Sequence, residues 1–395
     1  MPETSYPKDR IRVLLLENIS PAAEQTFRDA GYALVDRRSR AMTEDELIEE
    51  IGSVHILGIR SKTHLTRRVL DAAENLWAVG CFCIGTNQVD LDAAAERGIA
   101  VFNSPFSNTR SVAELVIASA VMLIRRIPAK DRAAHAGIWA KDHTGCFELR
   151  NKTLGIVGYG RIGSQVSVLA EAFGMQVLFH DIESRMPMGN AHGSTLDEVL
   201  SQSDVVTLHV PATPETKGMM TAERIAAMAD DSILINMSRG NVVDLDALAG
   251  ELRSGRLKGA AIDVYPQEPK RRGDAFDSPL RGLENVLLTP HIGGSTEEAQ
   301  FNIGIDAATK LVTYLETGSS MGSHTVPEVS VGPQDAVHRI LHIHENVPGV
   351  LSAINGALSE LGVNVIGQSL TTNQHLGYVV LDVARADSVE ALHEL

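Results

Sequence analysis

The sequence predicts an α/β protein with two doubly wound parallel sheets, followed by a small, incomplete ferredoxin-like domain. Three observations lead to this class. Short apolar runs alternate with segments of helical periodicity through residues 12–316. A glycine-rich turn at residues 154–163 joins one of these runs to a helix. Beyond a Gly/Ser-rich break at residues 317–324, the pattern changes to strand, helix, strand, strand and helix.

The first sheet is expected within the first 103 residues. Its strands are short apolar runs, as expected for strands that are buried on both faces. They are residues 12–16, 55–59, 77–79 and 100–102, and helical patterns at residues 21–30, 44–51 and 91–97 separate them.

The second sheet follows a long helical pattern at residues 111–125, which Ser111 is expected to cap with Glu114 three positions on. Its strands end next to polar residues, as expected for ligand sites at the carboxyl edge of a parallel sheet. The first strand lies in the glycine-rich run, and the others are residues 176–180, 205–208, 232–236, 259–263 and 286–289.

A helical pattern at residues 297–316 leads into the break at residues 317–324, which we interpret as a linker. The small domain has expected strands at residues 337–344, 364–370 and 377–383, a helix at residues 349–360, and a final helix from near Ser388. The sequence stops at Leu395, before the closing strand of a ferredoxin-like domain. We therefore expect a truncated domain with an unpaired sheet edge.

Composition restricts the possible partners. The 395 residues carry a formal net charge of −15, which argues against nucleic acid and membrane surfaces as partners. A content of 44% hydrophobic and 22% charged residues is typical of a soluble globular protein. The three cysteines have neither disulfide nor zinc-site spacing, and no apolar run has the length of a signal or membrane segment. We therefore expect a cytoplasmic protein.

The glycine-rich turn predicts a bound dinucleotide. Gly158 permits the tight turn, Gly160 lets the backbone approach a pyrophosphate, and Gly163 lets the helix pack closely on the strand. The helix at residues 162–173 directs its first N–H groups at that anion. Asp181 ends the next strand, where a carboxylate accepts the ribose hydroxyls of NAD and repels the 2′-phosphate of NADP. NAD is the predicted cofactor.

Three polar residues follow strands of the same predicted sheet. Hydride transfer between NAD and a hydroxyl or keto carbon needs an acid–base group at the oxygen and a cation for a substrate carboxylate. His291 has a suitable pKa, Glu268 can orient its imidazole, and Arg239 can bind a carboxylate with two donors. Each residue alone also fits a surface or turn position, so the prediction rests on their common place at strand ends.

Two other groups of residues have alternative interpretations. Arg60 and Lys62 supply local positive charge for an anionic substrate, or they belong to a solvated loop. His338, His342 and His344 are close in sequence, but no carboxylate or cysteine completes a coordination set. No metal site is therefore predicted.

Four motifs combine these residues: Gly-Tyr-Gly-Arg-Ile-Gly at 158–163, Asn-Met-Ser-Arg-Gly at 236–240, Ala-Ile-Asp-Val-Tyr-Pro-Gln-Glu-Pro at 261–269, and Leu-Leu-Thr-Pro-His-Ile-Gly-Gly-Ser-Thr at 287–296. They resemble the signatures of NAD-dependent D-2-hydroxyacid dehydrogenases. The stretches at residues 58–66, 80–90, 103–114 and 342–349 are similar to the bacterial D-3-phosphoglycerate dehydrogenase branch, which has a C-terminal ACT regulatory domain. The resemblance covers nearly the whole chain.

This resemblance implies roles by position. Arg239, Glu268 and His291 match the catalytic residues, with His291 exchanging the proton of the substrate oxygen. The implied substrate-binding residues are Arg60, Ser61, Lys62, Asn108, Arg239 and His291. The implied cofactor-binding residues are Gly158, Gly160, Arg161, Ile162, Gly163, Asp181, Asp263 and Gly293.

The resemblance also implies domains and partners. It predicts a discontinuous substrate-binding domain (1–107 and 296–318), an NAD-binding domain (108–295), a linker (319–334) and an ACT domain (335–395). His344, Asn346 and Asn364 match the effector positions for L-serine, whose polar groups an imidazole and two amides can bind. Members usually form homo-oligomers, often tetramers. Trp139 is either an interface anchor or a buried core residue.

The implied reaction is the NAD-dependent oxidation of 3-phospho-D-glycerate to 3-phosphohydroxypyruvate, the first step of L-serine biosynthesis, with L-serine as feedback effector. Two alternatives remain open. The same residues would serve another small anionic 2-hydroxy or 2-oxo acid, such as 2-oxoglutarate or hydroxypyruvate. An NAD-sensing corepressor or scaffold would keep the fold without turnover. The ACT segment and the cations Arg60 and Lys62 favour the metabolic enzyme.

Overall fold

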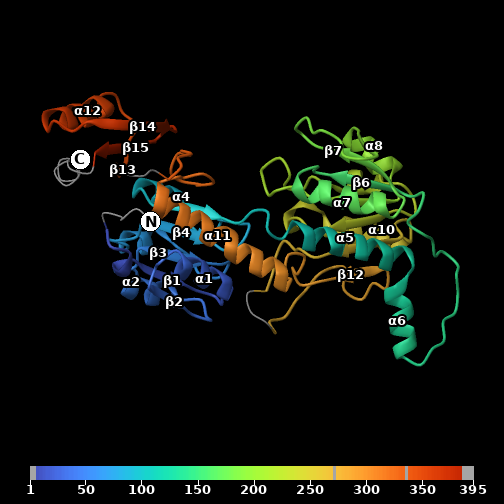
Figure 1. Cartoon of the computed structure of the whole chain (residues 1–395). Coiled ribbons are helices and arrows are strands. Elements are labelled where there is room, and N and C mark those ends of the chain that lie inside the picture. The colour runs from blue at the N-terminus through green and yellow to red at the C-terminus, as the bar shows by residue number, and fades with distance from the viewer. Residues whose placement is uncertain (1–5, 270–272, 334–336, 385–395) are drawn as a thin grey trace. The chain divides into compact units, whose positions relative to one another are not determined.

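The computed structural model describes residues 6–269, 273–333 and 337–384. It divides into two compact units (Figure 1): Met1–Ser107 with Glu297–Leu395 form the first, and Asn108–Thr296 form the second. The first unit contains one parallel and one small antiparallel sheet, and the second contains a larger parallel sheet. This arrangement confirms the predicted fold class.

The parallel sheet of the first unit has the strand order β2-β1-β3-β4-β5. Its strands are β1 (Arg12–Leu15), β2 (Leu34–Arg37), β3 (Ile56–Ile59), β4 (Ala78–Cys81) and β5 (Ala100–Asn103). The intervening helices are α1 (Pro21–Asp29), α2 (Glu44–Ile51), α3 (Arg67–Asp71) and α4 (Leu91–Glu96), after the 3-10 helix Lys8–Arg10. β3, β4 and β5 are buried at every position, so they appear as continuous apolar runs. β2 lies at the edge and is partly exposed, which explains why the apolar pattern does not predict it.

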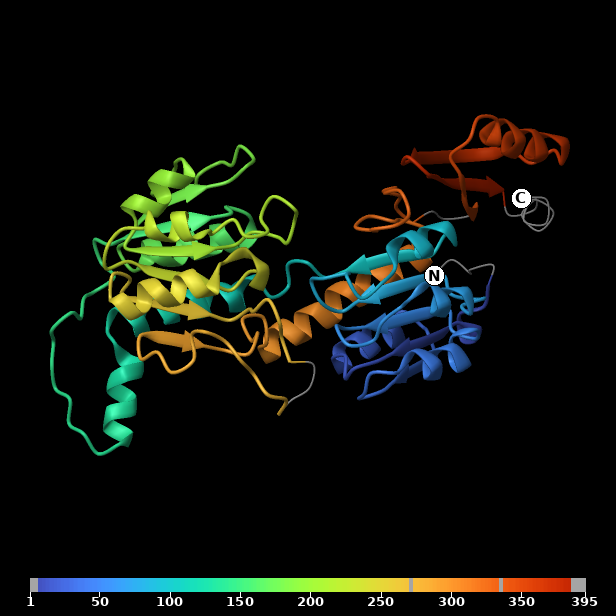
Figure 2. The same ribbon diagram turned by 180° about the vertical axis from the view of Figure 1, so that it is seen from behind.

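The helix α11 (Glu297–Thr317) returns to this first sheet from the far end of the sequence. Its buried residues Ile303, Ala307 and Leu311 pack with α1 against one face of the sheet. The helices α2, α3 and α4 cover the other face (Figure 2). A sheet with apolar helices on both faces accounts for the burial of its central strands.

The parallel sheet of the second unit has the order β12-β11-β10-β9-β6-β7-β8. Its strands are β6 (Thr153–Val157), β7 (Gln176–His180), β8 (Ala191–Gly193), β9 (Val205–Leu208), β10 (Ile233–Asn236), β11 (Gly259–Ile262) and β12 (Val286–Leu288). The helices are α5 (Thr109–Ile124), α6 (Ile127–His135), α7 (Arg161–Ala172), α8 (Leu196–Gln202), α9 (Ala222–Ala226) and α10 (Leu245–Ser254), with the 3-10 helix Gly240–Val242. α5 and α7 cover one face, and α8, α9 and α10 cover the other. The strand order changes direction between β6 and β9, where open α/β sheets bind ligands.

The start of α5 corrects a sequence prediction. The helix begins at Thr109, and Asn108 is its N-cap residue although its side chain makes no capping hydrogen bond. Ser111 lies within the first turn, and its Oγ atom is 2.9 Å from Oγ1 of Thr296. The predicted cap at Ser111 is wrong, because this hydroxyl has a partner that is remote in sequence.

The segment that contains Trp139 projects from the second unit together with α6 (Figures 1 and 2). Trp139 is 87% exposed and the preceding Ile138 is 61% exposed. The alternative of a buried core tryptophan is therefore wrong. The role of Trp139 as an interface anchor stays a prediction.

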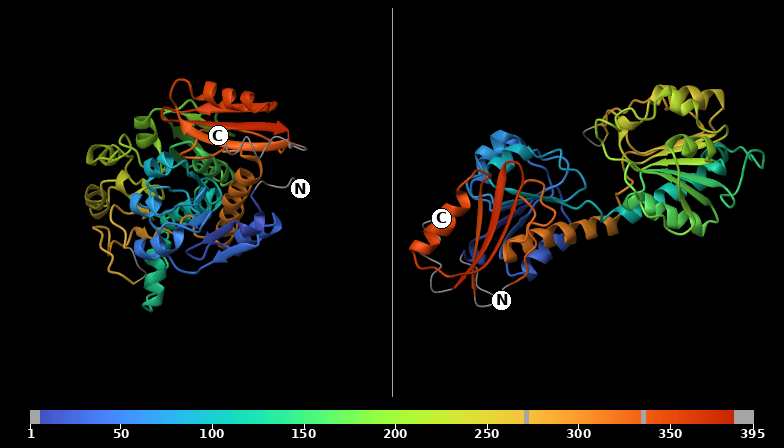
Figure 3. Two further views of the ribbon diagram at one scale, coloured as in Figure 1. Left: turned by 90° about the vertical axis from the view of Figure 1, so that its left-hand side faces the viewer. Right: turned by 90° about the horizontal axis from the view of Figure 1, so that it is seen from above.

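The small antiparallel sheet has the order β13-β15-β14. Its elements are β13 (Val337–Glu345), α12 (Val350–Glu360), β14 (Val365–Thr372) and β15 (Leu376–Ala384). α12 packs along one face (Figure 3), where Ile354 and Leu358 contact Ile340 and Val379. On the other face, Tyr378 joins the core around α11. The final helix expected from near Ser388 lies outside the described residues.

The predicted linker is packed as far as the structure describes it, which is to residue 333. Ser320 Oγ donates to the carbonyl oxygen of Pro327 at 2.6 Å, and Thr325 Oγ1 donates to that of Ile99 at 2.7 Å. Val326 and Val329 are buried in the core of the first unit. This stretch is therefore part of the folded unit rather than a flexible spacer. Among the described helices, none has both the length and the apolarity needed to cross a bilayer.

Candidate active site

The glycine-rich turn lies at the carboxyl end of β6, beside the point where the strand order reverses. Gly158 has φ +93°, and its N–H donates to the carbonyl oxygen of His180 at 2.8 Å. A Cβ atom at Gly163 would collide with the carbonyl oxygen of Gly158, whereas one at Gly160 would meet no atom within 4 Å. Gly163 therefore allows close packing, and Gly160 leaves open space above the turn.

This turn fits a dinucleotide. The N-cap of α7 is Gly160, so no side chain caps the helix, and the positive end of its dipole favours an anion. Arg161 and Ile162 form the first helical turn, and Ile162 packs against the core beneath it. The open cradle over Gly160 and the uncapped helix together supply what a pyrophosphate requires.

Asp181 directly follows β7, next to this turn. Its Oδ2 atom accepts the N–H of Tyr159 at 2.8 Å, and its Oδ1 atom accepts the N–H of Glu183 at 2.9 Å. Two backbone donors thus hold the carboxylate in one orientation. The aromatic ring of Tyr159 stacks on Phe179 at 3.9 Å, which further fixes the turn. The Asp181 side chain is 9% exposed, and Nε of Arg185 lies 3.6 Å from its Oδ2 atom. The carboxylate is thus placed to accept ribose hydroxyls, while Arg185 partly offsets its negative charge.

Arg239 follows β10, and Asn236 at the end of that strand holds its backbone in place. The buried Asn236 accepts the N–H and Oγ of Ser238 at 3.0 and 2.8 Å, and its amide donates to the carbonyl oxygen of Arg239 at 3.0 Å. The guanidinium donates to the carbonyl oxygen of Ser238 at 2.7 Å. Asn236 is a positioning residue that the sequence analysis missed, although it opens the Asn-Met-Ser-Arg-Gly motif.

Glu268 and His291 form a hydrogen-bonded pair. Nδ1 of His291 lies 2.9 Å from Oε2 and 3.1 Å from Oε1 of Glu268, and Oε1 also accepts the N–H of Tyr265 at 3.1 Å. Burial alone would raise the pKa of the Glu268 carboxyl, but the hydrogen bond and charge of His291 outweigh it and lower that pKa. The ionised carboxylate only accepts, so Nδ1 carries a proton and Nε2 is the nitrogen that can exchange one. The hydrogen bond that His291 donates to Glu268 raises the pKa of His291 against the effect of burial.

Asp263 organises the loop that carries His291. The carboxylate is 1% exposed, and it accepts the Thr289 hydroxyl at 2.6 Å and the N–H groups of Ile292 and Gly293, both at 2.8 Å. The carbonyl oxygen of Asp263 accepts the N–H of His291 at 2.8 Å. His291 has φ +54°, which non-glycine residues rarely adopt and which these bonds hold in place. Asp263 and Gly293 were predicted to contact NAD. That contact stays a prediction, and the structure shows that both residues take part in the hydrogen bonds that hold this loop.

These residues lie at the carboxyl ends of β6, β7, β10, β11 and β12, so one edge of the sheet carries the dinucleotide turn and the predicted catalytic residues. The arrangement combines a fixed cation, a proton-exchanging imidazole and a carboxylate that stabilises the imidazolium form. That combination suits proton and hydride transfer at a carbon bearing a hydroxyl group.

The comparisons with known proteins agree with this chemistry. Residues 117–293 match the family model "D-isomer specific 2-hydroxyacid dehydrogenase, NAD binding domain", and residues 340–395 match "AHAS small subunit-like ACT domain". The D-3-phosphoglycerate dehydrogenase of Escherichia coli K12 is 52% identical over 390 residues, which are 98% of this chain and 95% of that protein. The chain belongs to the D-3-phosphoglycerate dehydrogenase family. It is thus an NAD-dependent dehydrogenase with an ACT domain.

Other relatives support this family assignment. The Haemophilus influenzae enzyme of the same name is 51% identical over 394 residues, covering 100% of this chain and 96% of its own. Among solved structures, the TT0316 protein from Thermus thermophilus has a TM-score of 0.69 at 34% identity, covering 78% of this chain and 97% of its own. A D-lactate dehydrogenase from Aquifex aeolicus, complexed with NAD and lactic acid, has a TM-score of 0.68 at 29% identity, covering 80% and 100%.

The other predicted substrate residues lie in different parts of the chain. Arg60, Ser61 and Lys62 form the turn after β3 in the first unit, where Ser61 and Lys62 are exposed. Asn108 lies in the second unit, and its buried Oδ1 atom has no hydrogen-bond partner among the described residues. A buried acceptor without a donor is costly, and a ligand hydroxyl or N–H group would satisfy it.

The structure does not bring the three predicted effector residues together in one chain. His344 and Asn346 lie at the carboxyl end of β13, where Asn346 donates to the carbonyl oxygen of Asn373 at 2.8 Å. Asn364 precedes β14. The first residue of β14 lies opposite Val383 of β15, and Val383 lies opposite His338, near the other end of β13. Six residue steps along β13 separate His338 from His344, which is about 20 Å.

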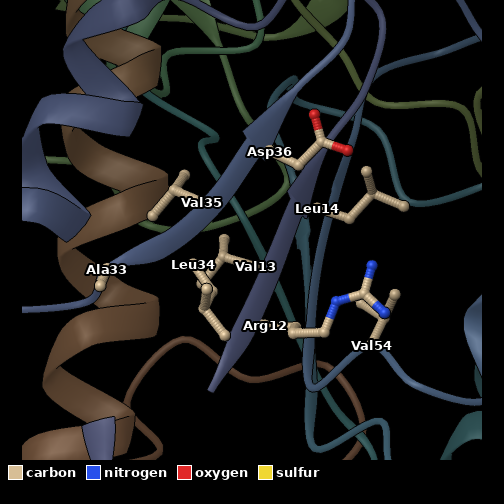
Figure 4. A pocket seen from close by; sticks show the side chains of 8 residues that line it. All are labelled: Arg12, Val13, Leu14, Ala33, Leu34, Val35, Asp36 and Val54. Atoms are coloured by element: carbon tan, nitrogen blue, oxygen red, sulfur yellow. The ribbon is translucent and has the colours of Figure 1, made fainter. Parts of the chain in front are cut away.

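A surface hollow of about 310 Å³ lies over β1 and β2 in the first unit (Figure 4). Arg12 and Asp36 are its charged lining residues, and the other lining residues are Val13, Leu14, Ala33, Leu34, Val35 and Val54. None of the predicted site residues lines it.

Proposed function

We propose that the chain oxidises 3-phospho-D-glycerate to 3-phosphohydroxypyruvate with NAD, as the first step of L-serine biosynthesis. The observation that carries this proposal is the Glu268–His291 pair at the sheet edge that also carries the dinucleotide turn and Arg239. Relatives that are about half identical over nearly the whole chain carry the name of this activity.

In this proposal the residues divide the work as follows. NAD supplies the acceptor for the hydride that leaves C2 of the substrate. His291 takes the proton of the C2 hydroxyl on Nε2, and Glu268 stabilises the resulting imidazolium. Arg239 binds the substrate carboxylate with two donors. Arg60, Ser61 and Lys62 bind the phosphate, and the unpartnered Oδ1 of Asn108 accepts a donor from the substrate.

We also propose a cytoplasmic homotetramer whose ACT domains pair to bind L-serine. The opposite positions of His344 and Asn364 on the small sheet support an effector site built from two copies of the chain. Burial and the neighbouring His342 lower the pKa of His344, so its imidazole is neutral at physiological pH and can accept a hydrogen bond. The exposed Trp139 is the proposed anchor of a second interface.

The decisive experiment is an NADH-formation assay with 3-phospho-D-glycerate, with and without L-serine. His291→Ala should lower kcat by about 10²–10⁴-fold, while the matched variant His192→Ala, which removes an exposed histidine of the same unit, should not change it. Turnover of 2-oxoglutarate or hydroxypyruvate alone would reassign the substrate. NAD binding without any turnover would favour a sensing or scaffold protein. Turnover that is insensitive to L-serine would refute the proposed feedback.

A further inference from the structure

One buried carboxylate lies beneath the turn that holds the proposed phosphate-binding residues. In the first sheet the strand order changes direction between β1 and β3, so the chain segments that follow these two strands are neighbours. Glu17 lies two residues beyond β1, and the turn Arg60–Thr63 directly follows β3. No local pattern in the sequence marks Glu17.

Glu17 accepts three backbone N–H groups of this turn. Its Oε1 atom accepts those of Arg60 at 3.0 Å and Thr63 at 2.8 Å, and its Oε2 atom accepts that of Lys62 at 2.9 Å. Glu17 is 7% exposed. Hydrogen bonds from N–H groups to an ionised carboxylate are strong, and burial strengthens them further. A single side chain therefore sets the path of the turn.

The backbone around Glu17 is also unusual. Glu17 has φ +62° and Asn18 has φ +54°, so two consecutive residues with side chains adopt the left-handed conformation. Their N–H groups donate to the carbonyl oxygens of Arg40 at 3.1 Å and Arg38 at 3.0 Å, respectively. Such a conformation persists only where the surrounding structure enforces it, and here it turns the Glu17 side chain toward the residues after β3.

A second buried residue holds the same turn from its carbonyl side. Gln88 is 3% exposed, and its amide donates to the carbonyl oxygen of Arg60 at 2.7 Å. The backbone of Arg60 is therefore fixed through its N–H by Glu17 and through its C=O by Gln88. Three of the four backbone donors of the turn bind Glu17, and the side chains of Arg60 and Lys62 supply its positive charge.

We propose that Glu17 is a positioning residue for the substrate phosphate: it fixes the turn Arg60–Thr63 so that the side chains of Arg60 and Lys62 converge on one anion. This inference rests on the proposed function. It also predicts the direction in which substrate affinity changes when Glu17 is replaced. The charge of Glu17 repels an anion, so removing that charge alone would tighten substrate binding, whereas loss of the positioning effect weakens it.

The test is Glu17→Gln, measured by the KM for 3-phospho-D-glycerate, kcat and the Kd of NADH. The new amide turns an N–H donor toward at least one N–H of the turn. KM should rise about tenfold, the effect of one lost buried hydrogen bond to a charged group. The kcat should change less than twofold, and the Kd of NADH should not change because the dinucleotide turn lies in the other unit. Glu96→Gln is the control, because it removes a carboxylate that binds Arg67 in the same unit and makes no contact with the Glu17 turn.

A second set of variants keeps the inference testable if Glu17→Gln folds poorly. Gln88→Met removes the other restraint on Arg60 with little change in shape and should also raise KM selectively. In an Arg60→Ala background the effect of Glu17→Gln on KM should shrink to less than about threefold, because residues that act through one another are not additive.

Three results would overturn the inference. They are an unchanged or lowered KM in Glu17→Gln, equal losses in kcat and NADH binding, and full additivity with Arg60→Ala. A wild-type protein that does not turn over 3-phospho-D-glycerate would instead refute the proposed function, and this outcome is separate from those three.

Discussion

The Glu268–His291 pair allows the sharpest prediction about catalysis, through the substitution Glu268→Gln. Glutamine keeps the size of the side chain and an oxygen that can accept the Nδ1 proton, but it removes the negative charge. The hydrogen bond and charge of Glu268 raise the pKa of His291, whereas burial opposes them. Glu268→Gln should therefore lower the pKa of His291 and make it a weaker base for the substrate hydroxyl.

The size of the effect follows from the geometry. A hydrogen bond to a charged group contributes about 1.5–3 kcal/mol when it is well shielded. The His291 and Glu268 side chains are 53% and 36% exposed, so solvent screening reduces the loss to about 1 kcal/mol. This energy corresponds to a decrease in kcat/KM of about fivefold for oxidation.

The pH dependence of catalysis shows in which direction the His291 pKa moves. Oxidation needs neutral His291, so kcat/KM rises as pH increases through the His291 pKa; reduction needs protonated His291 and falls through the same pKa. Because Glu268 raises this pKa, both limbs of the pH profile, the rise for oxidation and the fall for reduction, should move to lower pH in Glu268→Gln. Glu251→Gln, which removes a carboxylate bound to Arg256 in the same unit, should leave both limbs in place. Limbs that stay fixed or move to higher pH in Glu268→Gln would contradict the role of Glu268 in raising the His291 pKa.

Three other predictions concern the cofactor turn and stability. Gly163→Ala should lower the Tm because its Cβ collides with backbone, whereas Gly160→Ala should keep the Tm and weaken NADH binding in a titration by about tenfold or more. Burial lowers the pKa of His209 to about 3 from 6.5, so the unfolded chain binds one more proton between these values. His209 should therefore contribute a loss of stability that approaches about 1.4 kcal/mol per pH unit as the pH drops below about 6.5, and His209→Gln should remove this contribution in urea titrations. Arg339→Ala leaves Asp382 without its two hydrogen bonds, at 2.7 and 2.8 Å and with side chains 14% and 10% exposed, and should lower the free energy of unfolding by about 3 kcal/mol. Equal stability of Arg339→Ala and wild type would contradict this assignment.

The sequence determines the central elements of both parallel sheets. β9 is predicted to the residue at 205–208 because all four of its residues are buried, so its sequence is mostly apolar. β7 is predicted to the residue at 176–180 from its apolar centre Val-Leu-Phe, although its first residue is exposed. The glycine turn and Asp181 also follow from local spacing, since the strand, turn and helix are consecutive in the chain. Elements with weaker burial, such as the edge strand β2, give no comparable pattern.

Local patterns failed where distant residues set the outcome. Ser111 matches a capping motif, yet its hydroxyl pairs with Thr296, 185 positions away. The Gly/Ser-rich segment near residue 320 is typical of a linker, but Val326 and Val329 insert into the core of the first unit. In both cases a pattern of a few residues gave the wrong prediction because contacts with distant residues decide the structure there.

Some residues of the candidate site follow from local sequence, and others are recognised only in the folded chain. Sequence alone predicted catalytic roles for Arg239, Glu268 and His291, because each residue belongs to a motif at a strand end. Only the tertiary structure placed Glu17 beneath Arg60 and separated His344 from Asn364 along the small sheet. Periodicity records which face of a segment is buried, whereas strand order and register depend on pairing between segments that are distant in the chain. No local spacing encodes that pairing, so the neighbours of a functional residue emerge only when the sheet is assembled.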